Sequence, residues 1–139
     1  MSDFEWKRYI EEALSVTDYC SIATVDEKGV KYNLYFISQM HSRHMQNLKK
    51  NNRIAVSIYK TEQKGDVLGI QLEGTAEILT GNKDEMEKAF AIYFARAGKG
   101  KDQETYMNNP TWHFVKITPQ KMYYFDTRFF EEERQEVSL

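Results

Sequence analysis

Apolar and polar residues follow one another along this chain in two rhythms, one typical of strands and the other of helices. Stretches rich in β-branched and aromatic residues predict six strands, at 19–25, 30–38, 53–60, 67–79, 112–117 and 121–126. Three further segments predict helices, at 3–14, 42–51 and 84–97. The short links between successive strands favour a mostly β, antiparallel six-stranded sheet with helices, closed into a small barrel.

Residues at the ends of the helical segments support these predictions. Ser2 begins a capping box for the first helix, and Ser42 is placed to cap the second. Asn82 is placed to cap the third helix, which Gly98 ends. Each predicted helix therefore has a local start or stop signal of its own.

The length and charge of the chain narrow its class. Its 139 residues suit one hydrophobic core, so a single domain is predicted over 1–139, with 127–139 as a charged, solvated tail. Lys and Arg number 19 against 21 Asp and Glu, and this net charge of −2 argues against binding nucleic acid by bulk charge. Cys20 is the only cysteine, which fits a reducing cytoplasm, and no apolar run is long enough to span a membrane. We therefore expect a cytoplasmic protein without a nucleic-acid or membrane partner.

The densest cluster of candidate chemistry lies between His41 and Arg53. The first turn of a helix has unpaired N–H groups and the positive end of the helix dipole, so Ser42, Arg43 and His44 could together bind a phosphate monoester. A capped surface helix with solvated charges explains the same residues equally well. The basic residues near the end of this helix suit its negative dipole end, and a nucleic-acid patch there is the weakest alternative. No metal site is predicted, because the histidines have no cysteine or second histidine pair to complete one.

Four segments resemble, in the same order, the pyridoxamine 5′-phosphate oxidase-like family of FMN-binding split barrels. They are CSIATVDEKGV, LYFISQMHSRHMQNLKKNNRIAVSI, GIQLEGTAEIL and VKITPQKMYYFD, at 20–30, 34–58, 69–79 and 115–126. The second is the most specific, because a strand followed by S-R-H and a short helix ending in N-N-R is typical of the family. The resemblance is closest to small members and not to the longer true oxidase. It implies a six-stranded antiparallel split barrel that forms a homodimer, with FMN at the subunit interface.

The same resemblance implies which residues hold the cofactor. Ser42, Arg43 and His44 match the phosphate-binding positions of the family. The other positions implied to contact or lie near the flavin are Ser38, Ile37, Gln71, Gly69 and Trp112. No side chain is assigned a catalytic role, because a bound flavin supplies the redox chemistry while the protein binds and orients it.

The chain departs from this family at two places. Twelve residues, 30–41, separate the first turn from Ser42, and they reach at most about 40 Å when extended. Relatives have two strands there, and the missing one supplies contacts to the flavin ring, often including a basic residue. We therefore expect the phosphate half of the site to persist and the ring half to be reduced. Near the end of the last strand Arg128 is the only basic candidate for a substrate anion, so oxidation of pyridoxamine phosphate is not expected.

These expectations point to an FMN-dependent oxidoreductase that acts on a small substrate which the sequence does not specify. The alternative is a non-enzymatic carrier or sensor that holds flavin, or holds haem through His41, His44 or His113.

Overall fold

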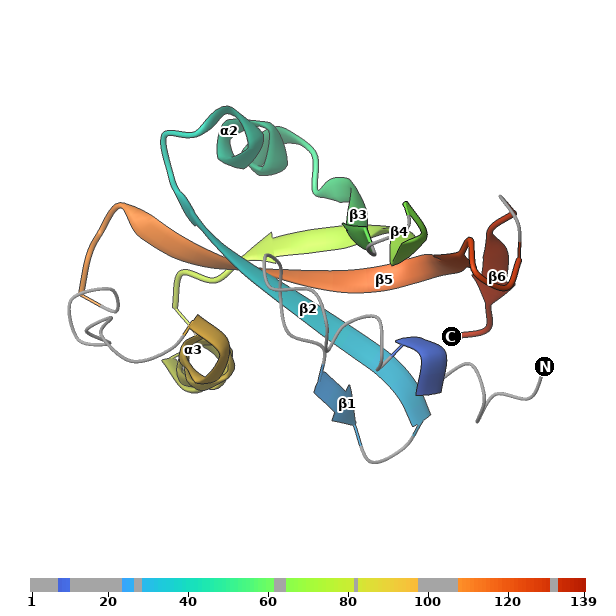
Figure 1. Ribbon diagram of the computed structural model, residues 1–139. Coiled ribbons are helices and arrows are strands. Elements are labelled where there is room, and N and C mark those ends of the chain that lie inside the picture. The colour runs from blue at the N-terminus through green and yellow to red at the C-terminus, as the bar shows by residue number, and fades with distance from the viewer. Residues whose placement is uncertain are drawn as a thin grey trace.

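The structure of the chain, a computed structural model, describes residues 8–10, 24–26, 29–61, 65–81, 83–97, 108–130 and 133–139. Residues 8–10 are helical and lie within the predicted helix 3–14, whose other residues are outside the described ranges. The labelled elements (Figure 1) are β1 (Thr24–Asp26), β2 (Gly29–Gln39), α2 (Arg43–Lys50), β3 (Arg53–Thr61), β4 (Val67–Ile78), α3 (Lys83–Ala97), β5 (Trp112–Asp126) and β6 (Gln135–Val137).

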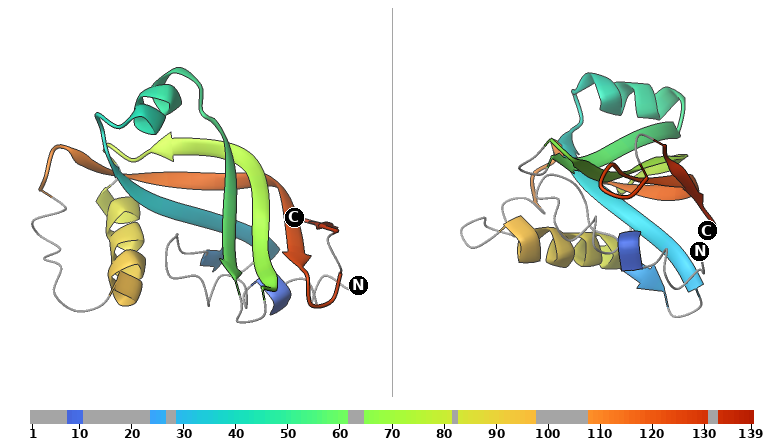
Figure 2. Two further views of the ribbon diagram at one scale, coloured as in Figure 1. Left: turned by 45° about the horizontal axis from the view of Figure 1, so that its top comes forward. Right: turned by 45° about the vertical axis from the view of Figure 1, so that its right-hand side comes forward.

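The strands form one antiparallel sheet in the order β1-β2-β5-β4-β3, and β6 pairs with β5 beside this path. The sheet curls strongly, as the two views of Figure 2 show. The predicted mostly antiparallel sheet is therefore confirmed, and it takes the form of a curled half-barrel.

The helices α2 and α3 cover opposite faces of the sheet. Val115 and Phe114 are neighbours on β5, so their side chains point to opposite faces. Val115 packs with Met45 of α2, whereas Phe114 packs with Phe90 of α3. Figure 1 shows α2 and α3 on these two sides. The main core fills the face that α2 covers, and its buried members include Leu34, Ile58, Ile70, Leu72, Met122 and Tyr124.

A single strand, β2, leads from the first hairpin to α2. Its first half pairs with β1, where Asn33 lies opposite Thr24. Its second half pairs with β5, beginning where Leu34 lies opposite Ile117. The prediction that only one strand fits between the first turn and Ser42 is therefore confirmed. Residues 19–23 of the predicted first strand lie outside the described ranges.

The prediction of separate strands at 112–117 and 121–126 is wrong, because both lie in the continuous strand β5. Pro119 lies between them and pairs with Gly74, and the register shifts just before that glycine. A side chain at Gly74 would collide with the carbonyl oxygen of Thr118, so the glycine lets the two backbones approach closely. This irregularity accommodates a proline that cannot donate to the ladder.

The prediction of a solvated tail over 127–139 is wrong in part. Residues 135–137 form β6, in which Val137 lies opposite Met122 of β5. Val137 is only 4% exposed and belongs to the main core. A single valine within an acidic run produces no period that would predict a strand, so its burial depends on the tertiary fold.

Candidate functional site

The segment between β2 and α2 is short and is fixed by backbone hydrogen bonds. The N–H of Met40 donates to the carbonyl of Thr111 at 2.8 Å, which ties the segment to the residues before β5. The N–H of Ser42 donates to the carbonyl of Gln39 at 3.0 Å, so the chain turns directly from strand to helix. The start of α2 is therefore held beside the end of β2.

Three polar side chains meet at this start. Ser38 Oγ lies 2.7 Å from His44 Nε2 and 3.2 Å from Ser42 Oγ, and Ser42 Oγ lies 3.2 Å from the same nitrogen. Ser38 is buried, at only 8% exposed, whereas His44 lies at the surface. The cluster therefore extends from the buried face of the sheet to the solvent. The ring of His44 also packs edge-on against Phe36, with the ring centroids 5.9 Å apart. The structure thus brings together three residues that the family resemblance implies for the cofactor site.

The first turn of α2 keeps its backbone donors available. Ser42 is the N-cap residue, but its side chain makes no capping hydrogen bond. The first bond of the helix runs from the N–H of Gln46 to the carbonyl of Ser42, so among the described residues the N–H groups of 43–45 are left as the unpaired donors. Arg43 is exposed beside them and makes no hydrogen bond or ion pair within the described part of the chain. N–H groups, hydroxyls and a guanidinium together fit the oxygens of a phosphate monoester.

His113, which the sequence offers only as a possible haem ligand, is a neighbour of this cluster. The antiparallel register pairs it with Ser38, and directly paired residues project to the same face of a sheet. Its Nδ1 is buried and has no hydrogen-bond partner among the described residues, which is unusual for a buried nitrogen. No local signal in the sequence relates position 113 to position 38.

Ile37 and Trp112 lie beside the cluster but point away from it. Ile37 precedes Ser38 on β2, so it projects to the opposite face, where it packs with the cluster around Phe114. Trp112 lies opposite Gln39, which places it on the same α3-covered side. The implied flavin contacts of Ile37 and Trp112 stay predictions.

Gln71 is far from the start of α2 within one chain. It lies opposite Tyr123 on β5, whereas Ser38 lies opposite His113 on the same strand. Positions 113 and 123 are separated by about 30 Å along the sheet, at about 3.3 Å per residue. The structure therefore does not bring Gln71 together with Ser38, Ser42 and His44 in a single copy of the chain.

Gly69 is buried where β3 and β4 approach each other closely. A side chain at this position would collide with the carbonyl oxygen of Ile58 and would lie 2.9 Å from the ring of Phe125. Packing alone therefore requires the glycine. Its implied contact with the flavin stays a prediction.

Arg134, which sequence reasoning missed, lies over the same part of the sheet as Gln71. Its Nη1 donates to Gln71 Oε1 at 3.1 Å, and its guanidinium lies 4.1 Å from the ring centroid of Tyr123. These three side chains line a hollow of about 280 Å³. The sequence contains no signal for this arrangement, because Gln71 and Arg134 are 63 positions apart.

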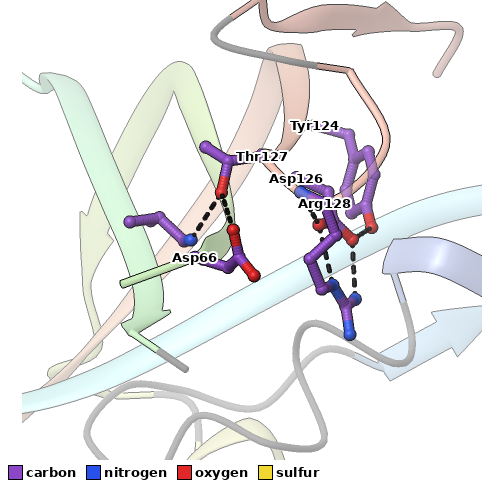
Figure 3. A network of polar contacts seen from close by, with 6 residues as sticks. Asp66, Tyr124, Asp126, Thr127 and Arg128 are labelled. Carbon is purple, nitrogen blue, oxygen red and sulfur yellow. Dashed lines mark hydrogen bonds and ion pairs between the residues drawn. The ribbon is translucent and has the colours of Figure 1, made fainter. Parts of the chain in front are cut away.

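Arg128, the candidate for binding a substrate anion, is already paired. Its Nε and Nη2 donate to the two carboxylate oxygens of Asp126 at 2.9 and 2.6 Å (Figure 3). The hydroxyl of Tyr124 donates to the same carboxylate at 2.8 Å. Burial alone would raise the pKa of Asp126, but the hydrogen bonds from Arg128 and Tyr124 and the charge of Arg128 outweigh it and lower the pKa below its ordinary value. The carboxylate is therefore charged and neutralises the guanidinium.

The sequence of the chain matches a known protein family over most of its length. A family model described as pyridoxamine 5′-phosphate oxidase matches residues 7–126. The chain belongs to the pyridoxamine 5′-phosphate oxidase family. No curated protein sequence matches it.

Solved structures of similar fold are distant in sequence from this family member. A Clostridium acetobutylicum protein of the pyridoxinephosphate oxidase family, related to general stress protein 26 of B. subtilis, has a TM-score of 0.58 at 18% identity, covering 99% of this chain and 97% of that one. The haem storage protein HutZ from Vibrio cholerae has a TM-score of 0.63 at 15% identity, covering 85% and 93%. A haem-binding protein from Mycobacterium smegmatis has a TM-score of 0.62 at 17% identity, covering 98% of this chain but 58% of its own. These similarities concern the fold alone.

Two kinds of feature are absent from the described residues. No described helix is long and apolar enough to cross a membrane. Nor do three or more histidine, cysteine, aspartate or glutamate side chains gather, in the described ranges, as they would around a metal ion.

Proposed function

We propose that this protein binds FMN, with the phosphate of the cofactor at the start of α2. The observation that supports this most is that Ser42 does not cap its own helix. In a merely capped surface helix, Ser42 Oγ would accept a hydrogen bond from the N–H of residue 44 or 45. Instead, Ser42 Oγ lies with Ser38 Oγ and His44 Nε2, and the backbone donors are left for another acceptor.

Charge supports the same proposal. Arg43 and His44 stand on the first turn of α2, and that turn contains no acidic residue. The positive end of the helix dipole therefore acts together with Arg43 on any anion bound there. Lys49 and Lys50 lie in the last turn, where they suit the negative end of the dipole instead.

The proposal includes a homodimer, because the two halves of the implied site lie far apart within one chain. A single FMN with its phosphate at Ser42 is not expected to reach Gln71 of the same chain, about 30 Å away along the sheet. A second copy of the chain would bring its own Gln71 to the ring of an FMN whose phosphate lies at Ser42 of the first copy. Each of two equivalent sites would then combine the α2 start of one subunit with the outer sheet face of the other.

Bound FMN would accept two electrons from a small donor and pass them to an acceptor, and the chain would bind and orient it. Because Asp126 already neutralises Arg128, pyridoxamine phosphate is not proposed as the substrate. The proposal includes a cytoplasmic location, with which the single cysteine, Cys20, agrees.

The second candidate is a non-enzymatic carrier or sensor of flavin or haem. The buried Nδ1 of His113, which has no hydrogen-bond partner among the described residues, favours it, as do the names of the haem proteins of similar fold. Against it, His44 Nε2 is within hydrogen-bond distance of two hydroxyls, which compete with an iron atom for that nitrogen.

The absorption spectrum of the purified protein tests these proposals. Flavin absorption bands in the protein as purified support the first proposal, FMN binding. Flavin bands that persist after FMN is added and the excess is removed also support it. Repeated reduction of the bound flavin by NADH or NADPH supports an oxidoreductase over a carrier. Haem bands without flavin binding favour the second candidate. A colourless protein that does not bind added FMN contradicts the first proposal.

A further inference from the structure

Arg134 lies over a row of side chains that crosses three strands on the outer face of the sheet. The register pairs Ser57 of β3 with Gln71 of β4, and Gln71 with Tyr123 of β5. Arg134 belongs to the segment before β6 and stacks on Tyr123 while it donates to Gln71. Two contacts of different kinds therefore fix the plane of its guanidinium, so little side-chain freedom remains to be lost on binding a ligand.

The surface beside Arg134 is hollowed, and basic side chains outnumber acidic ones among the residues that line it. Small side chains on β3 leave the hollow of about 280 Å³, and a neighbouring hollow of about 490 Å³ shares two of its lining residues, Ala55 and Glu73. Arg53, Lys121 and Arg134 line the two hollows together, against the single carboxylate of Glu73. This local excess of positive charge contrasts with the net charge of −2 on the whole chain.

Arg134 differs from Arg128 in that no carboxylate of the described residues pairs with it. Its contacts within the described part of the chain are with Gln71 and Tyr123, neither of which is negative. Arg128, six positions earlier, is held by both oxygens of Asp126. The charge of Arg134 is therefore available to a group that enters the hollow.

Resting on the proposed FMN function, we propose that Arg134 supplies the positive charge of the ring half of the site. β2 is the single strand between the first hairpin turn and α2, so no further strand is available there to contribute a basic residue. The segment before β6 brings a guanidinium onto Gln71, the residue implied to lie beside the flavin ring, from a different part of the chain.

This charge would act on the reduced form of the cofactor. A hydride donor such as a reduced nicotinamide transfers two electrons and one proton, so a neutral ring that takes up the hydride gains one negative charge and the donor becomes oxidised. A fixed cation beside that ring stabilises the reduced form more than the oxidised form. Arg134 therefore raises the midpoint potential of the bound flavin and contributes little to the affinity for oxidised FMN.

The test compares FMN-loaded wild-type protein with Arg134→Gln, Arg134→Lys and the control Lys88→Gln, which removes an exposed charge from α3. The measured quantities are the midpoint potential of the bound flavin and the dissociation constant of oxidised FMN. If Arg134 only holds the segment before β6 against the sheet, its substitution would change the stability of the protein without changing the midpoint potential of the flavin.

We expect Arg134→Gln to reduce the preference for the reduced cofactor at least tenfold, which is about 30 mV for a two-electron couple. Arg134→Lys should restore most of this loss, Lys88→Gln should behave as wild type, and the affinity for oxidised FMN should change less than threefold in all variants. If wild-type protein binds FMN and Arg134→Gln changes the preference less than twofold, the role of Arg134 is refuted while FMN binding stands. If wild-type protein binds no FMN, both proposals fall.

Discussion

Ser38 on β2 and His44 on α2 are joined by a short contact, with Ser38 Oγ and His44 Nε2 2.7 Å apart. The contact fixes the His44 ring at the first turn of α2, beside Ser42. We expect Ser38→Ala to weaken FMN binding about tenfold, because a hydrogen bond that orients a phosphate ligand is worth roughly 1.5 kcal/mol. Fluorescence titration with FMN measures this. Ser138→Ala, at an exposed position near the C-terminus, should bind FMN as wild type does. Equal affinity of Ser38→Ala and wild type would show that this contact does not serve the cofactor.

The separation of Gln71 from the start of α2 predicts the behaviour of mixed dimers. A dimer of one Arg43→Ala chain and one Gln71→Ala chain has one site with both defects and one site with neither, if each site combines halves from two subunits. We expect such a dimer to bind one FMN with wild-type affinity, while both parent homodimers bind more weakly. Titration of differently tagged, co-purified dimers measures the stoichiometry. Two equally weakened sites would mean that both halves come from one chain.

Asp126 links acid stability to the turn after β5. Its pKa is lowered in the folded protein, because the hydrogen bonds and charge of Arg128 and the hydroxyl of Tyr124 outweigh the effect of burial. A lowered pKa adds stability above the unfolded-state value near 3.8, and this stability is lost as the pH falls through the folded-state pKa. We expect Asp126→Asn to lower the free energy of unfolding by roughly 1–3 kcal/mol at pH 7, and by less below about pH 4.

Urea unfolding at pH 7 and pH 3 measures the effect of Asp126→Asn, with the exposed Glu87→Gln as the control for loss of one negative charge. A deficit of the same size at both pH values would show that the charge of Asp126 contributes nothing to stability.

Tyr35 links alkaline stability to α3. Burial, followed by the charge of Glu85 and the hydrogen bond to it at 3.3 Å, raises the pKa of Tyr35 from 10.0 to about 12. The neutral phenol is therefore favoured in the folded state, and stability is retained below pH 10 and lost as the pH rises towards 12. This loss is roughly 2–3 kcal/mol, at about 1.4 kcal/mol per pKa unit.

Tyr35→Phe should lack this alkaline loss. We expect its free energy of unfolding to fall less than that of wild type between pH 9 and pH 12, as measured by urea unfolding. Tyr59→Phe is the matched control, because Tyr59 is 63% exposed. Parallel pH profiles for Tyr35→Phe and wild type would contradict the raised pKa.

Local signals predict much of this fold and part of its site. The order of strands and helices follows from periodicity and capping residues, and Ser38, Ser42 and His44 are close in sequence, so a strand-to-helix turn is sufficient to gather them. β6, the neighbour His113 and the position of Arg134 depend on strand register and on contacts between distant residues, for which a single sequence carries no signal. Pro119 suggests a break between two strands, and only the opposing Gly74 makes the strand continuous.

The most direct test of the proposed site is a comparison of FMN affinities for wild type, Arg43→Ala and Lys49→Ala. Both substitutions remove one exposed positive charge from α2, but Arg43 is in its first turn and Lys49 is in its last. We expect Arg43→Ala to weaken FMN binding roughly 10- to 150-fold, which corresponds to about 1.5–3 kcal/mol for one charge-assisted phosphate contact. Lys49→Ala should change the affinity less than threefold. Equal affinities for the two variants would contradict the position of the phosphate at the start of α2.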